Sequence, residues 1–179
     1  MTHDEFIDFF IKIKLISVSE RTAADYEKCL RRYLPLRAAV SELNIFAAQN
    51  IMLNMNYLSY GTIRRNLTIL NQYSQYAVKY GYMVKNPFTD VERPRKRVID
   101  SLEQKVYSEN ELKDIFQALS SEDIFWRAFV TIALDSGARR GELVALRWCD
   151  LDFAEGYLRI SSSAYKMPHK NIAIKEPKG

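Results

Sequence analysis

The sequence has 179 residues, with 47% hydrophobic and 27% charged side chains, which is ordinary for a globular protein and enough to form a hydrophobic core. The formal net charge is +4 and the pI is about 9.0, which is compatible with a nucleic-acid partner but not specific to one. The basic excess lies in residues 1–100, which have 15 Lys and Arg against 10 Asp and Glu, whereas residues 101–179 have 11 against 12.

Other bulk features exclude several classes of protein. No apolar run approaches the roughly 20 residues that a membrane-spanning helix needs, and no signal peptide is recognisable. Cys29 and Cys149 lie far apart without metal-type spacing, which predicts reduced thiols in a cytoplasmic protein. Because His3 and His169 belong to no ligand cluster, we expect no structural metal.

The first three predicted elements are helices. Apolar residues recur at helical spacing in residues 4–15 and again from Ala23 to Tyr33, and Ser17 or Ser19 can supply the N-cap of the second helix. Pro35 ends the second helix, because proline disfavours helical backbone in the residue before it. A third helix is predicted over residues 41–54.

The fourth predicted helix, residues 62–80, has two contrasting faces. One carries a regular apolar stripe, and the other carries polar side chains with no acid among them: Arg64, Arg65, Thr68, Gln72, Gln75 and Lys79. Such side chains can bond both phosphate oxygens and base edges in a DNA groove, so these six are candidate DNA-binding residues. The alternative is an ordinary solvated helix face, although such a face normally mixes both signs of charge.

A basic segment follows this helix after Gly81 and the pair Asn86 and Pro87. Its four cations are candidate contacts to a DNA backbone: Arg93, Arg95, Lys96 and Arg97. Pro94 keeps the segment extended. A solvated interdomain linker is the plainer interpretation, and the two are compatible.

Beyond the linker, Ser108 and Glu111 form a capping-box pattern, so a new helix and a new domain are expected to begin there. Residues 125–134 predict a buried helix, and Asp150 to Asp152 predict a polar turn. Residues 157–160 and 171–174 alternate enough to predict short β-strands, with residues 167–169 in the connection between them.

The stretch from Leu134 to Trp148 is the most informative of the chain. Ser136 and Gly137 break the preceding helix, and another helix restarts near Gly141, so Arg139 and Arg140 are held at a tight junction. A guanidinium fixed there presents a planar fork of donors to a phosphate or a carboxylate. In the plainer interpretation one arginine pairs with Glu142 and the other is a solvated charge.

Residues 136–148 resemble the first arginine box of the tyrosine recombinases, or phage integrase family, whose pattern is roughly T-G-x-R-x-x-E-L-x-x-L-x-W. Ser136 replaces the usual threonine and keeps the hydroxyl. The resemblance implies that Arg139 holds the scissile phosphate and that Glu142 supports it. Residues 62–87 likewise resemble the last helix of the family's N-terminal domain and the N-P that follows it.

The resemblance implies a mainly α fold: a four-helix, SAM-like core-binding domain (residues 1–90), a basic linker (91–106) and the start of an α+β catalytic domain with a small β-sheet (107–179). It also implies a general-acid lysine, which matches Lys178 although Gly179 replaces the usual threonine. The family's second box, H-x-x-R, and its tyrosine nucleophile have no counterpart, so we expect a fragment or truncated product that cannot cleave DNA alone. Apolar surface should then be exposed around Ile160, Ile172 and Ile174.

These observations predict the DNA-binding part of a phage or mobile-element integrase. The family needs no ATP or essential metal, so no cofactor is expected. The expected partner is double-stranded DNA at an attachment-site core, with self-association on DNA in the full-length protein and no membrane contact. A non-catalytic DNA-binding protein or decoy remains an alternative. A helical protein-interaction module is the other, and its binding would be less sensitive to salt.

Overall fold

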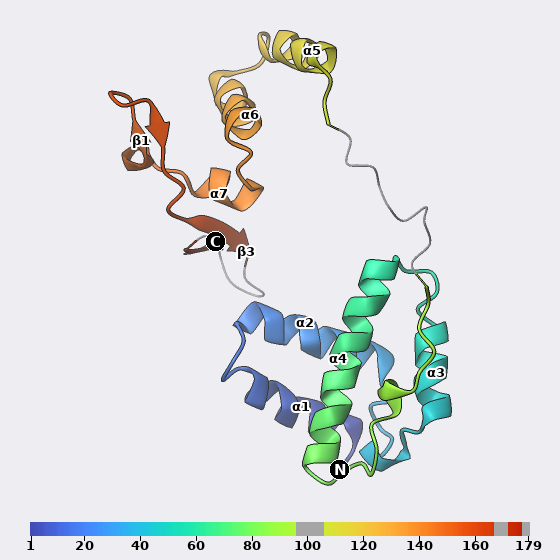
Figure 1. The fold of residues 1–179 in the computed structure, drawn as a ribbon. Coiled ribbons are helices and arrows are strands. Elements are labelled where there is room, and N and C mark those ends of the chain that lie inside the picture. Colours follow the sequence, from blue (N-terminus) through green and yellow to red (C-terminus); the bar gives the residue numbers. More distant parts are fainter. Residues whose placement is uncertain (96–105, 167–171, 177–179) are drawn as a thin grey trace. The chain divides into compact units, whose positions relative to one another are not determined.

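The computed structural model describes residues 1–95, 106–166 and 172–176, and it forms two compact units, Met1–Glu103 and Gln104–Gly179 (Figure 1). None of the helices in these described stretches is long and apolar enough to cross a membrane. Cys29 is a buried free thiol and Cys149 an exposed one.

The first unit is helical. It consists of α1 (His3–Lys14), α2 (Glu20–Tyr33), α3 (Ile45–Leu53), α4 (Tyr60–Lys79) and two 3₁₀ turns, η1 (Val40–Glu42) and η2 (Pro87–Thr89). Each of these α-helices is preceded by an N-cap residue whose side chain accepts a backbone N–H of the first turn. The N-caps are Thr2, Ser19, Asn44 and Ser59. Helix α4 packs against α1, α2 and η2, and η2 also packs against α3 (Figure 1).

The core of the first unit is aromatic at its centre. Tyr73 of α4 lies edge-on to Phe6 and Phe10 of α1, with ring centroids 5.1 and 5.7 Å apart, and all three side chains are buried. Leu30 of α2 and Leu70 of α4 are buried in the same core. This packing leaves the opposite face of α4 at the surface.

The predicted third helix is too long at its N-terminal end. Residues 40–42 form η1, and α3 begins only at Ile45, because Asn44 accepts the Ala47 N–H as N-cap. Phe46, one of the apolar residues of this segment, is 74% exposed, whereas Ile51 and Met52 are buried. Only some of the apolar residues of this segment therefore belong to the core.

The second unit begins with α5 (Glu109–Leu119), α6 (Ile124–Ser136) and α7 (Arg140–Ala145). The predicted capping box is confirmed, since Ser108 Oγ accepts the Glu111 N–H and Glu111 Oε2 accepts the Ser108 N–H. Helix α6 was expected to be buried, but it has no fully buried residue among those described.

Two small antiparallel sheets follow the 3₁₀ turn η4 (Trp148–Asp150): β1 (Leu151–Asp152) pairs with β2 (Tyr157–Leu158), and β3 (Ser163–Lys166) pairs with β4 (Ile172–Lys175). The mainly helical fold with a small sheet is confirmed, and the predicted strands at 157–160 and 171–174 correspond to β2 and β4, while the predicted connection at 167–169 lies outside the described residues. The partner of β4 is β3, which the sequence prediction missed, and Leu151–Asp152 is a strand rather than part of a turn.

Apolar side chains in the second unit are largely at the surface. In its described part, Leu143 and Ala145 are the only buried apolar residues. Ile172 and Ile174 are exposed as expected, while Ile160 is half-buried. Several apolar side chains elsewhere in the unit are more exposed than these, with Val106 at 88%, Trp148 at 82%, Phe153 at 80% and Ile124 at 76%.

Candidate nucleic-acid interface

The arginine turn, residues 136–140, joins α6 to α7. Gly137 has φ of 61°, the left-handed backbone that favours glycine, and its N–H donates to Ala133 O at 3.1 Å. Ser136 Oγ donates to Ile132 O at 2.5 Å and accepts the Ala138 N–H at 3.2 Å. The hydroxyl at position 136 therefore helps to close the turn.

Arg139 is held at this turn by a buried carboxylate. Glu142 Oε2 accepts the Arg139 backbone N–H at 2.8 Å, and Glu142 Oε1 accepts its Nη1–H at 3.0 Å. The Glu142 side chain is 6% exposed, whereas that of Arg139 is 72% exposed. The backbone hydrogen bond, together with the side-chain one, lowers the pKa of Glu142, so the carboxylate stays ionised at neutral pH. One edge of the guanidinium is therefore fixed at the surface, with a geometry suited to an oxyanion.

A second acid, Asp150, braces the chain beyond α7. Its Oδ2 accepts the Arg147 N–H at 3.0 Å, and its Oδ1 accepts the Ser161 hydroxyl at 2.7 Å. The sequence prediction treated Asp150 as part of a polar turn and missed this role. The three-residue spacing from Arg147 to Asp150, which matches that from Arg139 to Glu142, is the signal that could have indicated it.

The candidate residues of α4 lie on its outer face. Arg64, Arg65, Thr68, Gln75 and Lys79 are exposed, and Gln72 is half-buried. Although this face of α4 itself lacks acids, Asp25 of α2 lies against it, with Oδ2 at 2.7 Å from Arg65 Nη2. The Lys79 Nζ lies 5.9 and 5.8 Å from the ring centroids of Tyr76 and Tyr80.

The start of the basic segment reaches the N-terminal end of α4. Arg93 and Pro94 line a small hollow of about 70 Å³ together with Arg64, and Arg95 lines a neighbouring one. Arg64 and Arg93 therefore lie close together, as they would need to in order to contact the same stretch of DNA backbone. The predicted sites Lys96, Arg97 and Lys178 lie outside the described residues.

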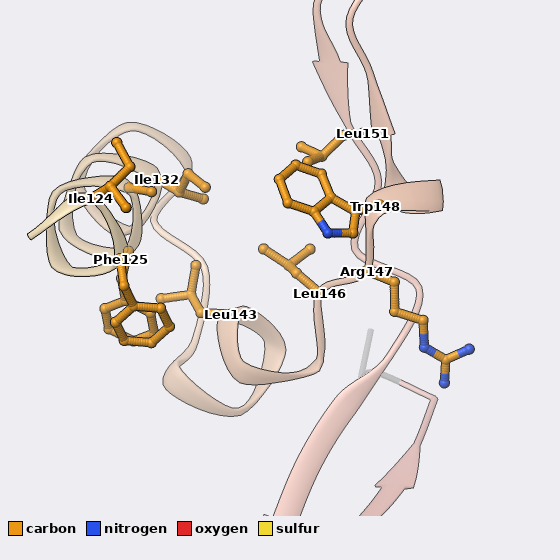
Figure 2. Close-up of a pocket in the computed structure, with 10 residues that line it drawn as sticks. Ile124, Phe125, Ile132, Leu143, Leu146, Arg147, Trp148 and Leu151 are labelled. Atoms are coloured by element: carbon orange, nitrogen blue, oxygen red, sulfur yellow. The ribbon is translucent and has the colours of Figure 1, made fainter.

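The second unit also contains an apolar groove of about 450 Å³, formed by α6, α7 and η4. Figure 2 shows Ile124, Ile132 and Phe125 of α6 on one side, Trp148 and Leu151 on the other, and the Arg147 side chain pointing away. Leu143 and Leu146 lie between them. Apart from Arg147, the lining is apolar, and none of the predicted site residues belongs to it.

Comparison with known proteins places these features in a family. Residues 105–175 match the model of the phage integrase family. The chain is 31% identical over 123 residues to a XerC-like tyrosine recombinase of Caldanaerobacter subterraneus, a match that covers 66% of this chain and 29% of the relative. It is 24% identical over 148 residues to the ICEBs1 integrase of Bacillus subtilis, covering 81% of this chain and 32% of that protein.

Solved structures agree with the fold. The Tn1549 transposon integrase in complex with a circular intermediate DNA matches with a TM-score of 0.77 and 22% identity, over 100% of this chain and 58% of that one. A lambda integrase dimer bound to a COC′ core site matches with a TM-score of 0.70 and 16% identity, over 98% of this chain and 62% of that one.

The chain therefore spans about a third of the length of these two curated relatives and about three fifths of the two solved integrases. Its family match includes the arginine turn, its fold is that of the integrases, and its helical first unit precedes the matched region. These findings support the tyrosine recombinase family, also called the phage integrase family, whose model residues 105–175 match.

Proposed function

We propose that this chain is the DNA-binding and phosphate-holding part of a site-specific tyrosine recombinase that acts on the attachment-site core of a phage or mobile element. Residues 1–90 act as the core-binding domain, 91–106 as a basic linker and 107–179 as the first portion of the catalytic domain. The observation that carries the proposal is the arrangement of Arg139, whose guanidinium is fixed by the buried Glu142 and yet is 72% exposed.

In this proposal the two units divide the work. The outer face of α4 and the basic segment bind the duplex, because Arg and Lys neutralise phosphates while Thr and Gln can reach base edges. Arg139 binds the phosphate to be cleaved, where a planar pair of N–H donors stabilises the charge on its oxygens. Lys178 acts as general acid toward the leaving hydroxyl. The nucleophilic tyrosine and the second arginine box have no counterpart in residues 1–179, so strand cleavage is not expected from this chain alone.

Titration of the chain with duplexes that carry candidate attachment-site cores, at two salt concentrations, tests the proposal. Affinity should fall steeply as salt rises, because bound phosphates release counterions. The double variant Arg65→Ala, Lys79→Ala should bind more weakly and with a salt slope that is smaller by about 0.9 for each lost phosphate contact. Arg37→Ala is the matched control, since Arg37 is an exposed cation outside the predicted set, and its effect should be negligible.

Two outcomes would contradict the proposal. Absence of DNA binding at low salt by a chain that circular dichroism shows to be folded would remove the DNA-binding role. Salt-insensitive association with another protein, through the apolar groove of Figure 2, would instead favour the alternative of a helical interaction module.

A further inference from the structure

Helix α7 and strand β3 pack against each other within the second unit (Figure 1), and Gly141 of α7 lies next to Ser163 and Ala164 of β3. A Cβ atom at position 141 would lie 2.6 Å from the Ala164 backbone oxygen and 2.9 Å from Ser163 Oγ. Both distances are shorter than van der Waals contact allows. The Ser163 hydroxyl can rotate away, whereas the Ala164 carbonyl can move only with its strand.

The backbone conformation at position 141 does not explain why a glycine is found there. Gly81, Gly137 and Gly156 have positive φ, but Gly141 does not, so an L-residue could adopt its helical backbone. Gly61 in the first turn of α4 is a natural comparison, because it is also helical and a Cβ there would have nothing within 4 Å. What distinguishes Gly141 is therefore the close approach of a strand.

That strand connects two parts of the proposed phosphate site. Ala164 of β3 pairs with Ile174 of β4, and β4 ends at Lys175, three residues before Lys178. Gly141 itself follows Arg139 by two residues and directly precedes Glu142. The contact at Gly141 therefore joins the arginine turn to the hairpin that leads into Lys178.

We propose that Gly141 is a positioning residue: by lacking a side chain it seats the β3–β4 hairpin directly on α7, so that the segment leading to Lys178 begins at a fixed distance from Arg139. The distance between Arg139 and this segment matters for catalysis only under the proposed function, on which the inference rests. The packing of the hairpin on α7 does not depend on DNA. A residue with a Cβ at this position displaces the hairpin but leaves in place the bond between Arg139 and Glu142 at the N-terminal end of α7.

Nuclear magnetic resonance of the complete 179-residue chain tests this. A spin label is attached at Lys175→Cys in a Cys149→Ser background, and its relaxation effect is measured at the amides of Arg139 and Arg140. Gly141→Ala should weaken this effect and shift the amide signals of Ala164 and Ile174. Gly61→Ala, the matched control, should leave all of them unchanged, because its Cβ meets open space.

Two further readouts separate positioning from damage to the turn. The side-chain Nε–H signal of Arg139 should keep its wild-type shift in Gly141→Ala, and DNA affinity should stay within about twofold. Ser163→Ala added to Gly141→Ala should not restore the hairpin, because the clash with the Ala164 carbonyl persists.

Unchanged hairpin signals in Gly141→Ala would overturn the proposal, and so would full restoration by Ser163→Ala. Loss of the wild-type Arg139 signal would also overturn it, since Gly141 would then support α7 itself. Because these signals are measured without DNA, a failure of the proposed DNA binding would be seen separately, in the titration.

Discussion

At the scale of single residues, Arg65 and Arg139 of the candidate interface each pair with an acid, but they are held very differently. Arg65 and Asp25 form an exposed pair, with side chains 60% and 47% accessible, and such pairs contribute about 0–1 kcal/mol. Arg65 can therefore leave Asp25 for a DNA phosphate at little cost. Arg139 is tied through both its backbone and its side chain to a buried carboxylate, so its orientation persists whether or not a phosphate is bound.

His3 predicts a pH dependence of stability in the first unit. Its Nδ1 lies 2.8 Å from the Tyr73 hydroxyl, and burial lowers its pKa from 6.5 to about 4. Between about pH 6.5 and pH 4, His3 is protonated in the unfolded chain but stays neutral in the folded unit. The free energy of unfolding therefore falls as the pH falls through this range, by at most about 1.4 kcal/mol per pH unit. Above that range this group does not contribute to the dependence.

Urea unfolding followed by far-ultraviolet circular dichroism at about pH 7 and about pH 5 measures this effect. The loss on acidification should be smaller in His3→Gln, which cannot titrate. An equal loss in His3→Gln and in the wild type would assign the pH dependence to the carboxylates instead.

At the scale of elements, the segment that leaves α4 is anchored by one buried amide. Asn86 Nδ2 donates to Asn71 Oδ1 at 2.8 Å and to Asn71 O at 3.2 Å, and its Oδ1 accepts the Phe88 N–H at 2.9 Å. These bonds fix η2 on α4, and the chain then continues through Val91 to the hollow shared by Arg93 and Arg64. The start of the basic segment is therefore placed by a structural asparagine.

Asn86→Ala should lower the free energy of unfolding of the first unit by about 1–3 kcal/mol, because it leaves the buried Phe88 N–H without its acceptor. The substitution should also weaken DNA binding, because the segment that carries Arg93 is no longer held against α4. Urea unfolding measures the first effect and the DNA titration the second. Lys85→Ala is the control, because its ion pair with Asp90 is exposed and should matter little for stability.

At the scale of the whole molecule, the two units differ in how much apolar surface they bury. The first unit has a continuous core from Phe6 to Val91, whereas the described part of the second fully buries only Leu143 and Ala145 among its apolar residues. Both tryptophans of the chain, Trp126 and Trp148, belong to the second unit and are 50% and 82% exposed. The second unit should therefore be the less stable one.

Unfolding of the chain should accordingly occur in two transitions. Tryptophan fluorescence reports on the second unit alone, so its midpoint in urea should be lower than that of the main circular dichroism transition. Emission should already be shifted to the red in the native state, because both indoles contact water. Coincident midpoints for the two signals would show instead that the units unfold as one.

The sequence by itself determined the local features. The N-cap of α2, expected at Ser17 or Ser19 and found at Ser19, the N-cap at Ser108 and the end of α6 at Gly137 all follow from interactions within a few residues. The mainly helical fold class was predictable for the same reason, since helical periodicity is local.

Only the tertiary structure decided the remainder. That Ser163–Lys166 is the partner of β4 depends on pairing across a connection, and short apolar runs do not specify their partner. The approach of Asp25 to Arg65, the burial of Glu142 and the contact of Gly141 with Ala164 join residues of different elements or depend on how those elements pack. The sequence therefore determined which residues could bind a phosphate, and packing determined which of them are held in place to do so.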